Sequence, residues 1–530
     1  MSGCFLLWYD SEMTKRQVAL IVLDGWGYRE DTKDNAVAAA KKPNFDRYWN
    51  QYPHTLLEAS GLAVGLPRGQ MGNSEIGHTT IGAGAPIDTD LVRINKAIET
   101  GTIGENEALL ALFAHVRNNN STLHMMGLLS DGGVHSHFEH LFAVLKEAKA
   151  AGIDRVAIHC FTDGRDTPPQ SAATYLKQLE AVIAEVGIGF IATVSGRFFA
   201  MDRDSNWDRL EKVEQAMFKC EGNVCHLGET NVSSFIEDLY TEGKVDEHID
   251  PIVCYGADGT ACAVEKNDGV FFYNYRPDRA RMISKKIIDR AEADNILYVT
   301  MTSYGDEYKT SVAFPAPSIV TTLAKEISAA GLTQAHIAET EKFPHATYFL
   351  NGGVEQPYEG EEHVLLASRK DVKTHDQAPK MRAEAIADEA IKRIEAGVDF
   401  LFINIANPDM VGHTANPQAI IEAVEETDTQ MSRIVEAIVA RGGVAIVTAD
   451  HGNAELNVDQ ITGDKHTAHT TNPVPCIVTD AAATLRPAAT KAENTDDMIA
   501  GSIADLAPTS LAYLCVTQPA QMTGKDLVVR

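Results

Sequence analysis

The chain has few cysteines and few basic residues for its length, and both shortages exclude certain classes of protein. Its 530 residues include eight cysteines and no Cys-x-x-Cys pair, so neither a disulfide framework nor a zinc ribbon is expected. Lys and Arg number 46 against 74 Asp and Glu, a formal net charge of −28. Such an acidic chain is a poor partner for nucleic acid or for an anionic membrane surface. A small anionic substrate would need a local cationic pocket.

Long hydrophobic runs are also missing. No apolar stretch reaches the ~20 residues that span a membrane. The segment before Gln17 has a short apolar patch without a basic region ahead of it, which predicts an extension rather than a signal peptide. The apolar fraction of 44% is typical of a globular protein, and 530 residues are enough for two or more domains. We expect a cytoplasmic protein with reduced thiols.

One arrangement recurs along the chain: a short apolar strand that ends in polar, reactive residues. The first such strand, Gln17–Leu23, ends at Asp24. Further strands are predicted at Thr122–Leu128, Arg155–Cys160, Phe190–Val194, Val270–Tyr273, Gln334–Ala338, Asp399–Ile405 and Val444–Thr448. Amphipathic stretches predict helices at Asn44–Tyr52, Phe138–Ala151, Ser171–Val186, Met381–Ala396 and Ala419–Ala440. This alternation predicts an α/β fold whose ligands bind beyond the carboxyl ends of parallel strands.

Ser74 is the candidate nucleophile. It stands among small residues, between Gly72 and Gly77, and glycine lets the backbone approach a ligand closely. If Ser74 opens a helix, free backbone N–H groups and the helix dipole would face an anion there. That environment suits a hydroxyl that attacks phosphorus. A helix cap with no chemistry is the simpler interpretation of one isolated serine, and only the rest of the chain favours the catalytic one.

Residues suited to binding a divalent metal stand near both ends of the chain. The candidates are Asp24, Asp409, His413, Asp450, His451 and His469. Asp409 and His413 are four residues apart and would share one face of a helical turn. This oxygen and nitrogen set suits Mn²⁺, Mg²⁺ or Zn²⁺, and it is large enough for two ions, which can clamp an in-line phosphoryl displacement. Each pair alone is better explained as a cap or a surface ion pair, but their recurrence at predicted strand ends favours a metal site.

Arginines follow the strand ends of the middle region. They are Arg165, Arg197, Arg203, Arg276, Arg279 and Arg281. Guanidinium groups match carboxylate and phosphate oxygens in bidentate fashion, which predicts an anion pocket. The alternatives are a solvated charged face and, for Arg276 and Arg279, helix capping. His135 is expected to contact substrate or phosphate, whereas His137 and His140 are expected to be structural rather than parts of a metal cluster.

The metal-ligand candidates lie before about residue 90 and after about residue 400, with the arginines between them. We therefore predict a discontinuous metal-binding domain formed by residues 1–88 and 317–530, in which residues 1–16 are an extension. An inserted phosphotransferase or substrate domain is predicted at residues 89–316. The crossing points are expected near Pro86–Asp90 and Ala313–Ser318, where turn residues occur.

Ten strings in order resemble the cofactor-independent (2,3-bisphosphoglycerate-independent) phosphoglycerate mutases, which belong to the alkaline phosphatase superfamily. The resemblance runs from about Gln17 to the C-terminus. The strings are LDGWG, MGNSEIGH, SDGGVHSH, TDGRDTPP, SGRFFAMDRD, FYNYRPDRAR, AETEKFPH, NPDMVGH, TADHGNAE and AHTTNPVP. The resemblance implies a phosphatase-like metal domain with an inserted transferase domain, and no motif position departs from the pattern.

The resemblance also implies residue roles. Ser74 would become a phosphoserine. One Mn²⁺ would be held by Asp24, Ser74, Asp450 and His451, and the other by Asp409, His413 and His469. Substrate contacts would come from His135, Arg165, Asp166, Arg197, Arg203, Arg276, Arg279 and Lys342. Among these, Lys342 would take up charge on the phosphoryl oxygens, and Asp166 with His135 would move the proton to and from glycerate.

The implied reaction is the interconversion of 2-phosphoglycerate and 3-phosphoglycerate in glycolysis and gluconeogenesis, catalysed by a metal-dependent isomerase. Two divalent ions are expected, Mn²⁺ first and Mg²⁺ or Co²⁺ as alternatives, and no bisphosphoglycerate. The protein is expected to be a monomer without nucleic-acid or membrane partners. A metal-dependent phosphatase or a phosphopentose mutase is the neighbouring alternative. A catalytically silent binding protein is the distant one, but it should have lost Ser74 or a metal ligand.

Overall fold

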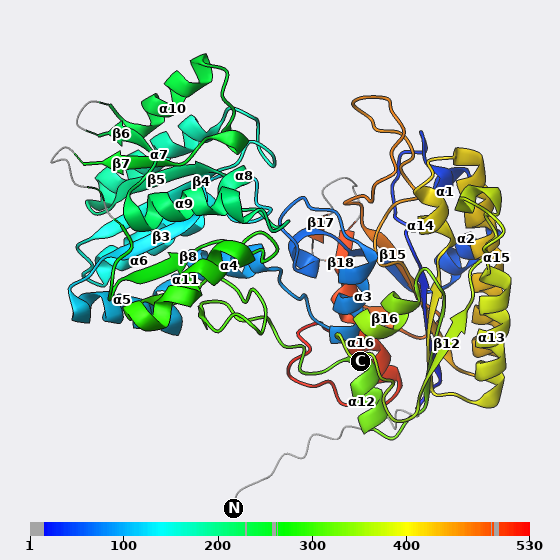
Figure 1. Cartoon of the computed structure of the whole chain (residues 1–530). Coiled ribbons are helices and arrows are strands. Elements are labelled where there is room, and N and C mark those ends of the chain that lie inside the picture. Colours follow the sequence, from blue (N-terminus) through cyan, green and yellow to red (C-terminus); the bar gives the residue numbers. More distant parts are fainter. Residues whose placement is uncertain are drawn as a thin grey trace, which may run out of the picture. The chain divides into compact units, whose positions relative to one another are not determined.

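The computed structural model describes residues 15–227, 230–256, 261, 263–488, 490–491 and 498–529. The chain divides into two compact units: Met1–Thr89 with Ser318–Arg530, called unit 1, and Asp90–Pro317, called unit 2 (Figure 1). Most of the predicted N-terminal extension, through residue 14, lies outside the described residues. In the part of the chain that is described, none of the helices is long and apolar enough to cross a bilayer.

Unit 1 is built on a nine-stranded sheet in the order β12-β11-β13-β1-β14-β15-β2-β18-β17. The five neighbouring strands β12, β11, β13, β1 and β14 are parallel to one another, whereas β15 runs antiparallel to both of its neighbours. The strands are β1 (Val18–Leu23), β2 (His54–Glu58), β11 (Gln334–Glu339), β12 (Glu361–Leu366), β13 (Phe400–Ile405), β14 (Val444–Thr448), β15 (Val474–Val478), β17 (Thr490–Lys491) and β18 (Met498–Ser502). A separate two-stranded sheet pairs β16 (Thr484–Leu485) with β19 (Val528–Val529).

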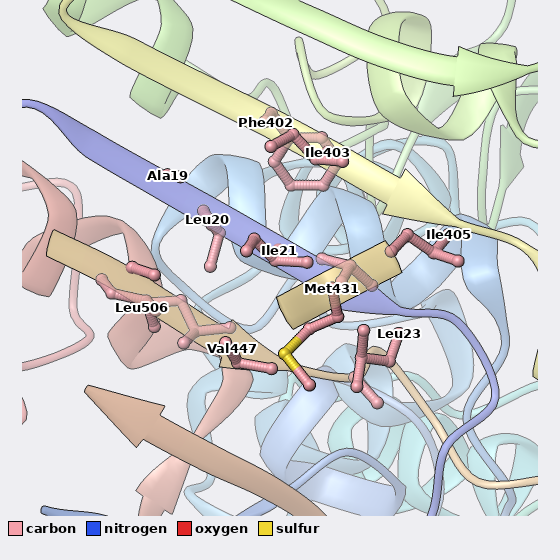
Figure 2. Close-up of a cluster of buried hydrophobic side chains, with 14 of the residues drawn as sticks. Ala19, Leu20, Ile21, Leu23, Phe402, Ile403, Ile405, Met431, Val447 and Leu506 are labelled. Atoms are coloured by element: carbon pink, nitrogen blue, oxygen red, sulfur yellow. The ribbon is translucent and has the colours of Figure 1, made fainter. Parts of the chain in front are cut away.

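The central strand β1 explains why the two ends of the chain form one unit. All six of its side chains are buried, as a continuous apolar run in a parallel sheet requires. It pairs with β13 on one side and β14 on the other, both from the C-terminal part of the chain. Figure 2 shows Leu20 and Leu23 of β1 packed with Met431, Val447 and Leu506 from that later part. The N-terminal strand β1 therefore forms the core of unit 1 together with strands from the C-terminal part of the chain.

Helices of unit 1 cover this sheet. The long helix α15 packs against α13, and the two run side by side in Figure 1. The helices are α1 (Ala36–Ala39), α2 (Pro43–Gln51), α3 (Ser74–Ala83), α12 (Leu323–Ala329), α13 (Ala383–Ala396), α14 (Asn407–Gly412), α15 (Pro417–Ala440) and α16 (Leu506–Tyr513), with a π-helical turn, η4 (His345–Phe349). Short 3₁₀ turns are η1 (Gly61–Val64), η5 (His375–Gln377) and η6 (Ile503–Asp505).

Unit 2 has its own eight-stranded sheet in the order β10-β9-β8-β3-β4-β5-β7-β6, parallel except where β7 meets β5. The strands are β3 (Leu123–Leu128), β4 (Val156–Thr162), β5 (Phe190–Gly196), β6 (Asn223–His226), β7 (Ile252–Tyr255), β8 (Gly269–Phe272), β9 (Leu297–Thr300) and β10 (Ser311–Val312). Its helices are α4 (Asp90–Glu99), α5 (Glu107–Asn119), α6 (Phe138–Ala150), α7 (Ala172–Val186), α8 (Arg197–Ala200), α9 (Trp207–Lys219), α10 (Val232–Thr241) and α11 (Arg281–Asp294), with 3₁₀ turns η2 (Thr102–Glu105) and η3 (Asp246–His248).

Strand alternation gives the sheet of unit 2 a core on each face. Met125 and Phe271 belong to one apolar cluster, whereas their chain neighbours Met126 and Phe272 belong to another. Successive side chains of a strand point to opposite faces, and both faces here are covered by helices. The predicted strands and helices are all present within two residues of their expected bounds. The strands that were not predicted include the edge strands β6 and β12 and the antiparallel β15.

Candidate metal centre and anion-binding cluster

Three neighbouring parallel strands bring carboxylates to one edge of the sheet in unit 1. The register pairs Leu23 with Ile405 and Val22 with Thr448, so β1, β13 and β14 end at the same level. Asp24 follows β1 directly, Asp409 lies in α14 just after β13, and Asp450 and His451 follow β14. Gly25 has φ of +75°, and a Cβ there would lie 2.7 Å from Asp409 Cα. Only glycine allows this approach.

Ser74 is the first residue of α3 and is buried. Asn73 caps the helix by accepting a hydrogen bond from the Ile76 N–H at 2.9 Å. The Ser74 hydroxyl lies 2.9 Å from His451 Nε2 and 2.5 Å from Lys342 Nζ. Gly77, one turn along, packs on Asp450, where a Cβ would come within 2.9 Å of the carbonyl oxygen. The helix therefore holds the Ser74 hydroxyl among the strand-end residues.

Lys342 lies at the centre of this cluster. Its Nζ donates to Asp24 Oδ1 at 2.8 Å and to Asp409 Oδ2 at 2.6 Å, as well as to Ser74. Burial alone would lower the pKa of Lys342, but Asp24 and Asp409 outweigh it and hold that pKa above its ordinary value. The ammonium group is therefore charged at neutral pH and is a fixed cation beside the Ser74 hydroxyl.

A second group of ligand atoms surrounds the other oxygen of Asp409. His413 Nε2 lies 3.3 Å and His469 Nε2 3.2 Å from Asp409 Oδ1. The far nitrogen of each ring faces a backbone carbonyl, since His413 Nδ1 is 2.7 Å from Thr467 O and His469 Nδ1 is 2.9 Å from Gly72 O. This outer bond directs Nε2 of both rings towards Asp409, as in metal-bound histidines. Hydrogen bonding to Asp409 raises the pKa of His413.

The chemistry of the cluster fits divalent cations. Asp24, Asp409 and Asp450 are all fully buried, yet Lys342 is the one ammonium group in contact with them among the described residues. Buried carboxylates are costly unless cations pair with them. Burial and then the charge of Asp450 raise the pKa of Asp24. Asp450 Oδ2 accepts no well-aligned hydrogen bond within the described ranges, although His78 Nδ1 lies 3.2 Å from it. Potential ligand atoms lie within 4.8 Å of one another in two groups: Asp409 with His451 and His469, and Asp24 with His78 and Asp450.

Several residues of this centre were missed from the sequence. His78 lies one helical turn after Ser74, with Nδ1 2.9 Å from Ser74 O and 3.2 Å from Asp450 Oδ2. Asn404, the fifth residue of β13, donates to Asp24 Oδ2 at 2.7 Å. A histidine four residues after Ser74 on a helix is a detectable signal, because both lie on one helix face. The role of Asn404 depends on strand register and leaves no signal in the sequence.

Glu455 joins the loops that carry the ligands, and it too was not predicted. Its fully buried carboxylate accepts hydrogen bonds from Gly27 N at 3.1 Å and from Asn453 N at 2.9 Å. It also accepts from Thr470 Oγ1 and, at 2.9 Å, from Asn472 Nδ2. One carboxylate thus ties the loop after Asp24, the loop after His451 and the segment that holds His469. The string GNAE, which follows Asp450 and His451, contains this residue.

The arginines of unit 2 lie in a separate cluster with three aspartates. Buried Arg197 donates from Nη1 to Asp163 Oδ1 and Asp166 Oδ2, both at 2.6 Å. Asp278 accepts from Arg203 at 2.9 Å and from Arg276 at 3.1 Å. Neither Asp163 nor Asp278 was predicted. Their carboxylates orient the guanidinium groups of the cluster.

The positive charge of Arg279 is the least neutralised by nearby carboxylates in this cluster. It donates to a backbone carbonyl, Met201 O, at 3.0 Å. Burial lowers its pKa, and Arg203, Arg197 and Arg165 lower it further, so these positive charges lie close together. Arg165 is largely exposed, with Glu247 at 3.5 Å. Crowded guanidinium groups repel one another, and an anion relieves that repulsion.

His135 is buried beside the arginine cluster. Its Nε2 is 3.9 Å from Asp166 Oδ2 and its Nδ1 is 3.6 Å from Asp278 Oδ1. Burial, with Arg197, lowers the pKa of His135 to about 4, so the ring is neutral at pH 7. His137 caps α6, and buried His140 contacts Asn95 Oδ1 at 2.8 Å. His135 thus shares its surroundings with Asp166, whereas the contacts of the other two histidines are structural.

Comparison with known proteins connects both clusters to one family. Residues 94–306 match the family model described as BPG-independent PGAM N-terminus, and residues 275–506 match that of type I phosphodiesterase / nucleotide pyrophosphatase. The chain is 45% identical to the 2,3-bisphosphoglycerate-independent phosphoglycerate mutase of Listeria innocua serovar 6a, over 97% of this chain and 100% of that protein. This chain belongs to the 2,3-bisphosphoglycerate-independent phosphoglycerate mutases. The protein of that name from Listeria monocytogenes serotype 4b matches with the same identity and coverage.

A crystal structure of this family shares the fold. The phosphoglycerate mutase of Leishmania mexicana, crystallised at low cobalt concentration, aligns with a TM-score of 0.52 and 28% identity. The alignment covers 98% of this chain and 99% of that one. The predicted family and the predicted fold, an alkaline-phosphatase-like α/β domain with an inserted transferase domain, are confirmed. A phosphopentose mutase and a silent binding protein are set aside, because identity extends over the full length of a phosphoglycerate mutase.

Proposed function

We propose that Ser74 carries the phosphoryl group in the reaction of this family, the interconversion of 2-phosphoglycerate and 3-phosphoglycerate in glycolysis and gluconeogenesis. The observation that supports this role is the position of the Ser74 hydroxyl. It opens α3, 2.5 Å from Lys342 Nζ and 2.9 Å from His451 Nε2. The free N–H groups of a helix start and an adjacent ammonium group are suited to a phosphoryl group. Because the chain carries its own nucleophile, bisphosphoglycerate is not needed.

For the metal ligands we propose the division that the family resemblance implies, and the closeness of these residues supports it. One ion would be held by Asp24, Ser74, Asp450 and His451, and the other by Asp409, His413 and His469. When bound, two divalent ions would activate the Ser74 hydroxyl and neutralise charge on the phosphoryl oxygens. Mn²⁺ is the expected metal, with Mg²⁺ or Co²⁺ as alternatives for a set of carboxylate and imidazole ligands.

Lys342 has the first role among the protein's own groups. Its charged Nζ donates to the phosphoryl oxygens as the Ser74 oxygen, which would lose its proton to solvent when the ions are bound, attacks phosphorus in line. Asp24 and Asp409 hold the ammonium group in place before substrate arrives. The lysine therefore contributes a preorganised positive charge next to the nucleophile.

The arginine cluster has the second role, which is to retain glycerate between two transfers. Arg165, Arg197, Arg203, Arg276 and Arg279 are assigned to the substrate carboxylate and hydroxyl groups. The departing alkoxide must gain a proton, and Asp166, beside neutral His135, is the candidate to deliver it. Because Arg197 donates to Asp166 Oδ2 in this structure, Asp166 must first take up a proton from solvent. Glycerate then turns and presents its other hydroxyl, Asp166 takes the proton back, and Ser74 returns the phosphoryl group. Exclusion of water during this interval separates a mutase from a phosphatase.

The test is an assay of purified protein with 3-phosphoglycerate and Mn²⁺, with and without EDTA and without added bisphosphoglycerate. We expect isomerisation that EDTA abolishes. Mass spectrometry of the enzyme quenched during turnover should find phosphate on Ser74. Phosphate on Ser130 or Thr79 in its place would assign the nucleophile elsewhere. A monomeric state and a cytoplasmic location are parts of the same proposal, and gel filtration and cell fractionation test them.

A further inference from the structure

Two histidines and a glutamate form a second ligand cluster on strands β11 and β12 of unit 1. Glu361 and His363 are two residues apart on β12 and share one face, as do Gln334 and His336 on β11. The strands are parallel, and the register pairs Gln334 with Glu361 and His336 with His363. All four side chains therefore lie together near the β12 edge of the sheet. None of them belongs to the site described above.

The hydrogen bonds of Glu361 leave one of its oxygens facing the histidines. Its Oε2 accepts from Tyr358 N at 2.7 Å, which fixes the carboxylate. Its Oε1 lies 2.6 Å from His363 Nε2 and 3.2 Å from His336 Nδ1. Asn351 Nδ2 also donates to Oε1, at 2.8 Å. The remaining atom of this amide, Asn351 Oδ1, is buried and has no partner in the ranges that the structure describes.

The surroundings of His336 contain more hydrogen-bond acceptors than a neutral ring can satisfy. Its Nε2 lies 3.2 Å from Gln334 Oε1, and Gln334 Nε2 is committed to Ala324 O at 2.8 Å. Its Nδ1 lies 2.9 Å from Ala346 O and 3.2 Å from Glu361 Oε1. A neutral imidazole has one N–H, so the nitrogen without a hydrogen directs its lone pair at oxygen. Burial lowers the pKa of His336 to about 4, which disfavours the doubly protonated ring.

A bound cation would take up the lone pair of His336 Nδ1, and the carbonyl of Ala346, 2.9 Å from the same nitrogen, must then turn away from the ring. We propose that His336 Nδ1, Glu361 Oε1 and His363 Nε2 form a third divalent-cation site, selective for borderline ions of the zinc class. The three atoms lie within 4.8 Å of one another. A half-turn of the Asn351 amide exchanges its two atoms and supplies an oxygen as fourth ligand. The Nε2–H of His336 then donates to Gln334 Oε1, the outer hydrogen bond that metal-bound histidines usually make.

The distances agree with a tetrahedral ion after a small adjustment. Ligand bonds of ~2.0–2.1 Å place tetrahedral ligand atoms ~3.3 Å apart. His336 Nδ1 and Glu361 Oε1 are already 3.2 Å apart. His363 Nε2, at 2.6 Å from the same oxygen, must withdraw by less than about 1 Å. Four protein ligands leave no open coordination position, which is typical of a structural site rather than a catalytic one.

The site would anchor the segment that carries Lys342. The N–H of Ala346 donates to Lys342 O at 3.0 Å, and the ring of Phe343 lies edge-on to His363 with centroids 6.0 Å apart. Ala346 and Asn351 lie in or just after the turn η4 that follows Lys342. An ion held between this turn and two strands would fix the backbone on which the lysine stands.

The experiment counts zinc in four proteins: wild type, Glu361→Gln, His363→Gln and Glu362→Gln. Each is stripped with chelator, dialysed against the same low Zn²⁺ concentration and measured by elemental analysis. Glu362 is the matched control, because it lies next along β12 and its side chain pairs with Arg393 at 2.6 Å instead of with the histidines. The wild type and Glu362→Gln should each hold one equivalent more than Glu361→Gln and His363→Gln. This difference does not depend on how many ions the Ser74 centre binds.

A second measurement uses the wild type alone, in case a variant fails to fold. Crystals soaked in Zn²⁺ should show an anomalous scattering peak between His336, Glu361 and His363. Equal zinc content in all four proteins, or anomalous maps without a peak at that place, would overturn the proposal. The cluster would then be a buried hydrogen-bonded group of two histidines and a carboxylate.

Discussion

The two units present opposite charge at the same kind of place. In unit 1 the strand ends carry Asp24, Asp409 and Asp450 around one lysine, so carboxylates are in excess. In unit 2 the strand ends carry more arginines than aspartates, and the arginines include Arg197, Arg203, Arg276 and Arg279. One fold principle, ligands at the carboxyl ends of parallel strands, thus produces a site for cations and a site for anions.

This difference explains how a chain with a net charge of −28 can handle phosphoglycerates. The acidic cluster needs cations before it can accept a phosphoryl group, whereas the basic cluster can bind a carboxylate without them. We therefore assign transfer of the phosphoryl group to unit 1 and retention of glycerate to unit 2. The following predictions test this division, from the largest expected effect to the smallest.

Removal of divalent ions should abolish isomerisation, because the buried carboxylates of unit 1 then lack their cations. The measurement is the rate of 2-phosphoglycerate formation in protein stripped with chelator, before and after return of Mn²⁺, Mg²⁺, Co²⁺ or Zn²⁺. No bisphosphoglycerate is added at any stage. Full mutase activity in verified metal-free protein would contradict the account of unit 1.

Ser74→Ala should lower kcat by about 10³-fold or more, since a covalent nucleophile is lost. The variant should still bind 3-phosphoglycerate, because the arginines of unit 2 are unchanged. Thr79→Ala is a matched control on the same helix, because Thr79 Oγ1 donates to Glu75 O and is exposed. A Ser74→Ala enzyme with near wild-type kcat would refute the role of Ser74.

Much of the site could be predicted because its residues stand next to strongly patterned strands. The run that ends at Leu23 is continuously apolar and, in the structure, fully buried. Asp24, the next residue, was therefore expected at the carboxyl end of a buried strand. The same reasoning located Asp450, because β14 is equally apolar. In these cases local hydrophobicity and position along the chain were sufficient.

The rest could not be predicted, because it depends on register and on contacts between distant loops. The strand β12 begins Glu-Glu-His, and Val364 is its one buried apolar residue, so it has little apolar pattern. The pairing of His336 with His363 appears only when β11 and β12 are aligned. Glu455 joins its own loop to the loop after Asp24, 428 residues away, and to the segment that holds Asn472. A lone glutamate in a loop gives no sign of these contacts.

Glu455→Gln should weaken metal binding in unit 1 by ~10–100-fold, the size of effect typical of groups that orient metal ligands, because Glu455 ties together the loops that carry them. An amide has one acceptor oxygen and cannot hold the N–H groups of both Gly27 and Asn453 together with Thr470 and Asn472. Metal affinity is measured by calorimetry, and thermal unfolding is followed in parallel. Excess Mn²⁺ should restore activity if Glu455 is a positioning residue, whereas an unchanged metal affinity would remove it from that role.

Arg279→Ala and Arg203→Ala should lower mutase turnover ~30-fold, since a charge-assisted contact to a desolvated anion contributes roughly 2–4 kcal/mol. The metal content of unit 1 should not change. Arg281→Ala is the matched control, because Arg281 donates to Tyr304 O at 2.8 Å and is not assigned to substrate. A loss in the control as large as in Arg279→Ala would mean that general charge, rather than the assigned contacts, sets turnover.

The most direct test of the division between the units is to measure released phosphate and isomerised product side by side in wild type and Arg279→Ala. Both proteins should form phosphoserine at Ser74. In the variant, glycerate should escape before it turns, and water should then complete the reaction. The ratio of phosphate released to isomer formed should therefore rise in Arg279→Ala. If both rates fall in strict proportion, the arginines serve only to bind the intact substrate, and the assignment of glycerate retention to unit 2 is wrong.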